Sequence, residues 1–114
     1  LIIYRRLRLI KRKTQESEYT NLHLSQSFFP ESMHGCFMLF QTQDLIKIKG
    51  FDERYFLYME DIDICKKIDV INKKKMYFPN ETITHLHQRG SANKINLLFQ
   101  HLLSARKYFK KWQN

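Results

Sequence analysis

The sequence Gly-Phe-Asp-Glu-Arg-Tyr-Phe-Leu-Tyr-Met-Glu-Asp-Ile-Asp-Ile-Cys occupies residues 50–65. The segments on either side of it are interpreted by their position relative to this stretch. It places three carboxylates, Glu60, Asp61 and Asp63, within four residues, directly after an aromatic segment. Like charges this close repel one another, so such a cluster is typical of a helix start, a metal site or a catalytic base. Spacing alone favours a helix start and leaves catalysis or metal binding open.

Two helices are predicted around this stretch. The longer one begins near Glu60, because Ile64, Ile68 and Ile71 share one face and the acidic residues fall in its first turn. A shorter helix precedes it, for which Thr42 suits the N-cap and Gly50 the left-handed position after the last turn. Both helices lie close to the acidic cluster in sequence.

Three short segments have the patterns of strands. Residues 36–40 are continuously apolar, as in a strand covered on both faces. Residues 76–78 precede a proline, and residues 82–87 alternate with period two, as in a half-buried strand. Strands between helices predict an α/β fold.

The two ends of the chain are basic and amphipathic. Residues 1–13 predict a basic helix that either rests on a membrane or packs through its apolar stripe, and residues 14–32 predict a polar loop. The C-terminal segment predicts a long helix with a basic last turn. Its expected core-facing stripe is Leu98, Leu102, Ala105, Phe109 and Trp112. The chain thus divides into residues 1–32, 33–92 and 93–114.

Composition limits the possible classes of protein. The chain has 114 residues, the size of one domain, and a net charge of +9 that is concentrated at its ends, which favours contact with anionic lipid or nucleic acid. No apolar run approaches the roughly 20 residues that span a bilayer. Cys36 and Cys65 form no CxxC pair, which indicates a reduced, intracellular chain with both thiols as buried apolar fillers. The first residue is Leu1 within a helical pattern, so we expect a piece of a longer protein.

A second group of polar residues follows the last predicted strand. His85 and His87 are two apart, so they point to opposite faces of a strand and cannot easily share a metal ion. A single histidine is more often structural, although one of the two remains a candidate ligand. Arg89 and Ser91 flank a glycine, and this combination suits a phosphate-bearing ligand.

The order of these pieces carries more information than any one of them. Residues 35–39, then residues 50–65, then His85 with Ser91, resemble the C-terminal half of family 2 glycosyltransferases, most closely the bacterial rhamnosyltransferase-like members. The resemblance covers residues 33–112. It implies a partial GT-A domain, a Rossmann-like α/β fold whose C-terminal half carries the acceptor site, here with flanking amphipathic helices.

The resemblance also implies roles for individual residues in an inverting, metal-dependent transfer of a sugar from a nucleotide-sugar donor. Asp61 corresponds to the catalytic base and Glu60 to its partner, while His85 corresponds to a ligand of a divalent cation, Mg²⁺ or Mn²⁺. Arg89 and Ser91 are expected at the donor diphosphate. The residues expected to line the acceptor side are His34, Tyr58 and Asp63.

Departures from the family pattern restrict what the chain is expected to do alone. The Asp-x-Asp metal motif and the nucleotide-binding strands expected upstream are absent, so we expect no turnover without that half. The implied acceptor is a glycan or a lipid-linked glycan in cell-surface polysaccharide synthesis, with the enzyme in the cytoplasm at the inner face of the membrane and with no nucleic acid. The alternative is a non-catalytic module that binds anionic lipid or nucleic acid through its basic ends.

Overall fold

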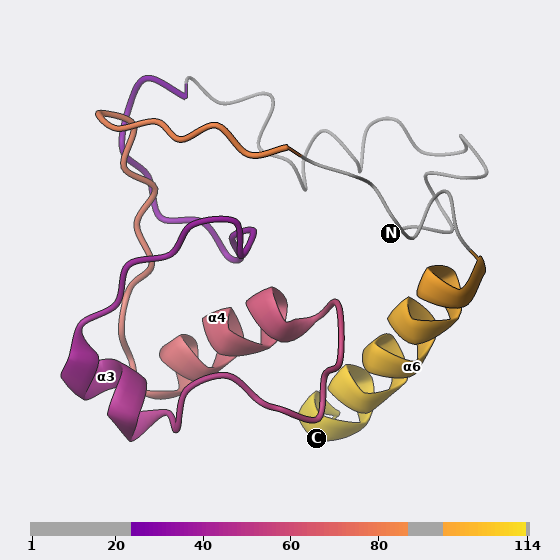
Figure 1. Cartoon of the computed structure of the whole chain (residues 1–114). Coiled ribbons are helices and arrows are strands. Elements are labelled where there is room, and N and C mark those ends of the chain that lie inside the picture. The colour runs from indigo at the N-terminus through magenta and orange to yellow at the C-terminus, as the bar shows by residue number, and fades with distance from the viewer. Residues whose placement is uncertain (1–23, 87–94, 114) are drawn as a thin grey trace.

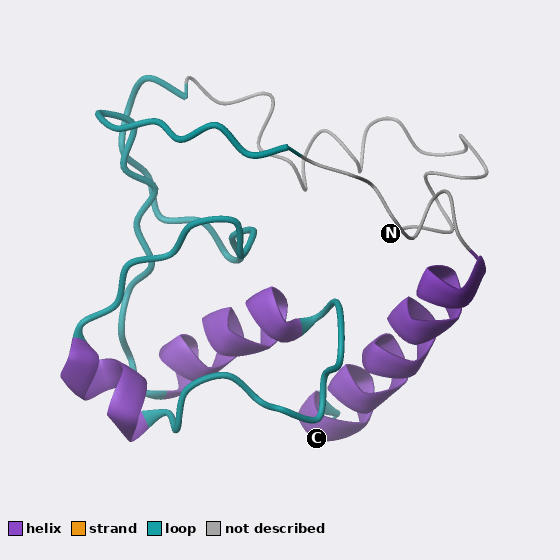
Figure 2. Cartoon of the chain, in the orientation of Figure 1, coloured by secondary structure: helices purple, strands orange, loops and turns teal. Residues whose placement is uncertain are grey.

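The computed structural model describes residues 24–86 and 95–113, which contain three helices (Figure 1). Helix α3 covers Thr42–Lys47, α4 covers Glu60–Val70 and α6 covers Ile95–Trp112. A loop connects α3 to α4, and α4 lies between α3 and α6 (Figure 2). The acidic cluster therefore begins the central helix.

Backbone hydrogen bonds define both ends of helix α3. Its N-cap is Gln41 rather than Thr42, because the Gln41 carbonyl accepts the Leu45 amide at 3.1 Å and so starts the helix one residue earlier than predicted. At the other end, Lys49 and Gly50 both have φ of 59°. The Gly50 amide donates to the Leu45 carbonyl at 2.9 Å, which confirms the left-handed glycine that the sequence predicts there.

The core lies between α3 and α4. Helix α4 begins at Glu60 as predicted, and its face carrying Ile64 and Ile68 is buried against Ile48, just after α3. Burying such a side chain contributes about 1.5–3 kcal/mol, so this small cluster accounts for much of the contact between the two helices. Partly buried residues extend it: Met38, Phe40, Leu45 and Ile71.

The predicted strands do not form within the described residues. Residues 36–40 are in a loop in which Met38 and Phe40 pack on the core, while Leu39 is 92% exposed. The side chains alternate as in a strand, but a strand also needs a neighbour for its backbone groups, and none of the described segments pairs with this one. Residues 82–86 likewise form no strand, and residues 76–78 contribute one antiparallel bridge between Tyr77 and Phe28.

The GT-A arrangement as a whole stays a prediction. Of the two thiols, Cys65 is buried as expected, whereas Cys36 is exposed, because it lies in the turn before the core-facing part of its loop.

No described helix is long and apolar enough to cross a membrane. The predicted N-terminal helix over residues 1–13 lies outside the described residues, as do Arg89 and Ser91.

Helix α6 confirms the predicted long helix, but its most buried face is shifted from the predicted stripe. Phe109 and Leu102, expected in the core, are exposed, and the buried residue of the helix is Ser104. The face toward the rest of the molecule is polar because its partners are carboxylates and carbonyl groups, as described below. The predicted core-facing stripe of α6 is therefore correct in part, because Leu98, Ala105 and Trp112 are half-buried whereas Leu102 and Phe109 are exposed.

Candidate active site around Asp61

A buried network of polar side chains joins α4 to α6 at Asp63. Asp63 has no exposed surface, and its Oδ1 accepts the Tyr55 hydroxyl at 3.1 Å and the Trp112 Nε1–H at 2.8 Å. Lys111 Nζ donates to both carboxylate oxygens at 2.8 Å. Buried polar groups with all their partners present order their surroundings strongly, so this network determines how α6 meets α4.

The same lysine connects the network to the turn after α3. Lys111 Nζ lies 2.7 Å from Asp52 Oδ2, and Arg54 donates to both oxygens of Asp52 at 2.9 and 2.6 Å. The Arg54 guanidinium is the main cause of an Asp52 pKa well below its usual range; Lys111 also lowers this pKa, and burial opposes both. The Gly-Phe-Asp-Glu segment is thereby fixed to the C-terminal turn of α6.

The backbone that leads into α4 is strained. Tyr58 and Met59, neither of them glycine, have φ of 67° and 72°, and each such conformation costs about 1–3 kcal/mol. Two hydrogen bonds hold this segment: Ser104 Oγ donates to the Leu57 carbonyl at 2.7 Å, and the Asp63 amide donates to the Met59 carbonyl at 2.8 Å. Strain of this kind clusters at functional sites, here directly before the paired carboxylates Glu60 and Asp61.

Asp61 is held at the start of α4 by a segment 26 residues earlier in the chain. Its Oδ2 accepts the Gly35 amide at 3.3 Å and lies 3.8 Å from His34 Nδ1, while its Oδ1 accepts the Ile62 amide at 2.8 Å. The side chain is 22% exposed. The structure therefore brings Asp61 and His34 together, as two of the predicted site residues, with the carboxylate still accessible from outside.

Opposing influences act on the Asp61 carboxyl. Burial works to raise its pKa, but the bonds from His34, Ile62 and Gly35 outweigh burial, so the pKa lies below its ordinary value of 3.8. Asp61 is consequently a carboxylate at neutral pH. It has the protonation state that a general base requires.

The pKa of Glu60, the neighbour of Asp61, is shifted in the opposite direction. Burial raises its pKa above the ordinary value of 4.5, and the charge of Asp61 adds to the rise. Its Oε2 is buried and has no hydrogen-bond partner among the described residues. Adjacent carboxyls whose environments move their pKa values apart are a recurrent feature of acid–base sites.

Gly35 tests how closely Asp61 is held. A Cβ at position 35 would lie 3.3 Å from the Asp61 Cβ, so Gly35→Ala forces the two segments apart by a few tenths of an ångström. We expect the Gly35–Asp61 hydrogen bond to weaken, the Asp61 pKa to rise toward 3.8, and stability to fall by about 1–3 kcal/mol. Carbon NMR of the Asp61 carboxyl against pH measures the change in pKa, and urea unfolding measures the change in stability. An unchanged Asp61 titration would contradict the contact.

Of the residues predicted at the metal and the diphosphate, the structure describes His85 alone. His85 is exposed, and Arg89 and Ser91 lie outside the described residues. Within residues 24–86 and 95–113, no group of three or more His, Cys, Asp or Glu side chains could hold a metal ion. The described residues thus offer His85 as one candidate ligand and do not form a metal site.

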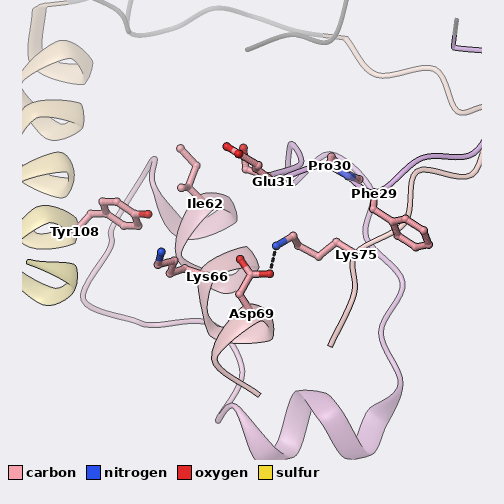
Figure 3. A pocket seen from close by; sticks show the side chains of 9 residues that line it. Phe29, Pro30, Glu31, Ile62, Lys66, Asp69, Lys75 and Tyr108 are labelled. Carbon is pink, nitrogen blue, oxygen red and sulfur yellow. Dashed lines mark hydrogen bonds and ion pairs between the residues drawn. The ribbon is translucent and has the colours of Figure 1, made fainter. Parts of the chain in front are cut away.

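A cavity of about 580 Å³ lies on another face of α4, between the segment at Phe29 and helix α6 (Figure 3). Its α4 side is formed by Ile62, Lys66 and Asp69, and Lys75 pairs with Asp69 across it. Its full lining is Phe29, Pro30, Glu31, Ser32, Ile62, Lys66, Asp69, Lys75 and Tyr108. None of these was predicted as a site residue, because the cavity combines segments that are far apart in the sequence.

The residues of α6 that support the site lie within the stretch covered by the family resemblance, but no role is predicted for them from the sequence. Ser104, Tyr108 and Lys111 recur at i, i+4 and i+7, a helical spacing that marks one face, and His101 belongs to the same row. That row is polar, whereas the stripe predicted to face the core is apolar. The polar row carries the contacts to residues 52–63.

The sequence of this chain is similar to those of known rhamnosyltransferases. The chain is similar to the Escherichia coli (strain K12) protein Rhamnosyltransferase WbbL, with 32% identity over 75 residues, which are 65% of this chain and 28% of the relative. It is also similar to the N-acetylglucosaminyl-diphospho-decaprenol L-rhamnosyltransferase of Mycobacterium tuberculosis, in strain H37Rv and strain CDC 1551, with 30% identity over 71 residues, which are 60% of this chain and 23% of the relative.

These similarities support a relationship between this chain and glycosyltransferases in general, without identifying a particular family. The match spans about a quarter of the length of the relatives. No family model matches the chain, and no solved structure matches it.

Proposed function

We propose that this chain is the acceptor-side part of an inverting glycosyltransferase, with Asp61 as the general base. The enzyme would move a sugar, rhamnose by analogy with the names of the relatives, from a nucleotide-sugar donor to a glycan or lipid-linked acceptor in cell-surface polysaccharide synthesis. The observation that carries the proposal is the ionised, partly exposed Asp61 carboxylate, held between Gly35 and the first turn of α4.

The chemistry follows from this carboxylate. Asp61 accepts the proton of an acceptor hydroxyl as the hydroxyl oxygen forms a bond to the anomeric carbon of the donor sugar. The bond from that carbon to the diphosphate breaks on the opposite side, and the electron pair leaves with the diphosphate. The configuration of the anomeric carbon inverts, and the proton remains on Asp61 until solvent removes it.

The acceptor side would be lined by His34 and Tyr58. His34 is 82% exposed at its side chain and lies beside Asp61, and Tyr58 is partly exposed two residues before Glu60. Asp63 is the remaining candidate from the sequence, but it has no exposed surface and its oxygens are engaged by Lys111, Trp112 and Tyr55. We therefore give Asp63 a structural role and leave it out of the lining.

Metal dependence is a separate proposal. His85 is a candidate ligand for Mg²⁺ or Mn²⁺, and further ligands would have to come from outside the described residues. Contact of Arg89 and Ser91 with the donor diphosphate is likewise a proposal from sequence. No step above depends on either.

Glu60 gives the proposal a pH signature. Its folded pKa is raised, so its contribution to stability is present below about pH 4.5 and is lost as the pH rises through the folded pKa. We expect Glu60→Gln to stabilise the chain at pH 7, by about 1 kcal/mol, and to have little effect near pH 4. Urea unfolding at both pH values measures this difference. Equal effects at the two pH values would show that Glu60 is not a buried, unpaired carboxylate.

The function is tested by sugar transfer. The chain, joined to the upstream part of the Escherichia coli relative, is incubated with nucleotide-linked rhamnose and with lipid-linked N-acetylglucosamine as acceptor. We expect transfer of rhamnose to the lipid-linked sugar. Donor hydrolysis without transfer, in a folded fusion that binds donor, would contradict an acceptor-side role.

The alternative is a non-catalytic module for anionic surfaces, and one observation favours contact with lipid. Arg54, Lys107, Lys110 and Lys111 line a groove of about 410 Å³. Arg54 and Lys111 are already paired with Asp52, so Lys107 and Lys110 remain as the contributors of charge. Such a groove is compatible with peripheral contact at the inner face of the cytoplasmic membrane, which we propose as the location of the enzyme, with no role for nucleic acid.

A further inference from the structure

One face of helix α6 is apolar and exposed. The helix lies at an edge of the described part of the molecule, with α4 on its inner side (Figure 1). On that inner side Ser104 and Lys111 bond to Leu57 and Asp63. The exposed apolar side chains recur at i, i+4, i+7, i+8 and i+14 and so share the opposite face, which we call the outer row: Ile95, Phe99, Leu102, Leu103 and Phe109.

The outer row differs from scattered hydrophobic residues on a surface. Its N-terminal part is the most open, with Ile95 84% and Phe99 60% exposed. At about 1.5 Å per residue, the row from Ile95 to Phe109 extends over about 21 Å of helix. Single exposed apolar side chains need no explanation, but a continuous apolar strip marks a surface that binds another apolar surface.

The charges on α6 indicate which kind of partner covers the outer row. The helix contains no Asp or Glu. Arg106 and Lys110 follow Leu102 at i+4 and i+8, so they continue the outer row toward the C-terminus, and both are exposed. Lys107 is exposed beside them and lines a groove with Lys110. An apolar face that continues into cations is typical of a helix in the interface of a bilayer with anionic lipid.

A second copy of this chain fits the outer row less well than lipid does. Each chain carries a net charge of +9, so two copies would bring Arg106 and Lys110 against the same cations, with no carboxylate on α6 to pair with them. Anionic headgroups supply that charge at the depth that long basic side chains reach from an apolar surface. The helix would lie on the membrane, because no described helix is long and apolar enough to cross it.

We propose that α6 lies in the surface of a membrane with anionic lipid, with the outer row among the acyl chains and Arg106 and Lys110 at the phosphate groups. The sequence predicts a core position for Leu102 and offers residues 1–13 as the membrane helix, so this contact falls on a different helix. Because the Asp63 network fixes α6 to α4, the contact would also set the orientation of the start of α4 relative to the membrane. The proposal goes beyond sugar transfer and does not depend on it.

The test is flotation of the full chain with vesicles of phosphatidylcholine and phosphatidylglycerol in a molar ratio of about 3:1. We expect Phe99→Gln with Leu102→Gln to weaken binding by at least about tenfold, because two buried apolar contacts with lipid are lost. Glutamine favours the helix, and Trp112 fluorescence checks that α6 still meets Asp63.

The matched control is Phe37→Gln with Leu39→Gln. It removes the same two kinds of side chain from exposed positions in the loop before α3. We expect this variant to bind vesicles like the unaltered chain. The contribution of charge is measured with Arg106→Gln and Lys110→Gln together, which should weaken binding to these vesicles by about tenfold or more and hardly change binding to phosphatidylcholine alone.

No binding by the unaltered chain, full binding after the Phe99 and Leu102 substitutions, or an equal loss in the Phe37 and Leu39 control would each overturn the proposal. Dimers in solution that the Phe99 and Leu102 substitutions separate would assign the outer row to a second copy instead. Loss of vesicle binding in the fusion to the upstream part of the Escherichia coli relative would show that this part covers the row. All these results are read without donor or acceptor, so they are distinguishable from failure of the transfer assay.

Discussion

Replacing Asp63 with Ala is expected to destabilise the chain by about 3–5 kcal/mol, because it leaves Lys111 without one of its two carboxylate partners in a buried network. The Tyr55 hydroxyl and the Trp112 indole N–H lose their acceptor at the same time. A whole domain is stable by only about 5–15 kcal/mol, so the change removes a large share of the total. Trp112 is the one tryptophan of the chain, and its fluorescence during urea unfolding reports on the network directly.

Asp69→Ala is the matched control for Asp63→Ala. It removes the same side chain from the same helix, but the Asp69 side chain is 47% exposed, and its partner Lys75, which is mostly buried, keeps the Cys65 carbonyl as an acceptor. We therefore expect a loss of about 1 kcal/mol. Similar losses for the two variants would show that the α4–α6 network does not hold the helices together. A second variant, Asp63→Leu with Lys111→Met, should recover part of the stability because it removes the unpaired charge along with its partner.

Asp61→Asn is expected to lower the rate of sugar transfer by about 10²–10⁴, the usual contribution of a general base. Asparagine keeps the shape of the side chain, and its one amide oxygen can keep the shorter bond from the Ile62 amide at the cost of the longer one from Gly35, so the fold should be largely preserved. It cannot take a proton from the acceptor hydroxyl at neutral pH. The loss should therefore appear in kcat, with KM for the donor nearly unchanged.

Asp44→Asn controls for the loss of a negative charge in the same assay. Asp44 lies in α3, where its Oδ2 is 3.3 Å from Lys73 Nζ, and the described contacts of Asp61 do not include it. We expect transfer at the rate of the unaltered enzyme. A comparable fall in both variants would point to a general effect of charge or folding rather than to proton transfer at Asp61.

The helices near the acidic cluster were predictable because local signals specify them. Ile64 and Ile68 mark the face of α4 that is buried, and Gly50 adopts the left-handed conformation that ends the turn after α3. These features depend on residues three or four positions apart, which a sequence displays directly.

The strands and the face of α6 were not predictable in the same way. Residues 36–40 have the apolar pattern of a strand, but pairing depends on a neighbouring segment, and none of the described segments supplies it. In α6 the apolar stripe dominated the pattern, although Ser104 and Lys111 face the rest of the molecule because Leu57 and Asp63 offer acceptors there. Such matches between distant polar groups leave little trace in the spacing of one segment.

The candidate site was predictable in part. Asp61 and His34 were both named from sequence and lie together, whereas no role was predicted for His101, whose ring lies against Tyr58. The Gly35 amide bond to Asp61 joins residues 26 positions apart, a distance at which spacing carries no signal.

The most direct test of the account is the single-turnover rate of rhamnose transfer by Asp61→Asn, measured at saturating donor alongside donor affinity in the same preparation. We predict a rate lower by about 10²–10⁴ with donor affinity within about twofold of the unaltered enzyme. Transfer at the unaltered rate would contradict the role of Asp61 as the base.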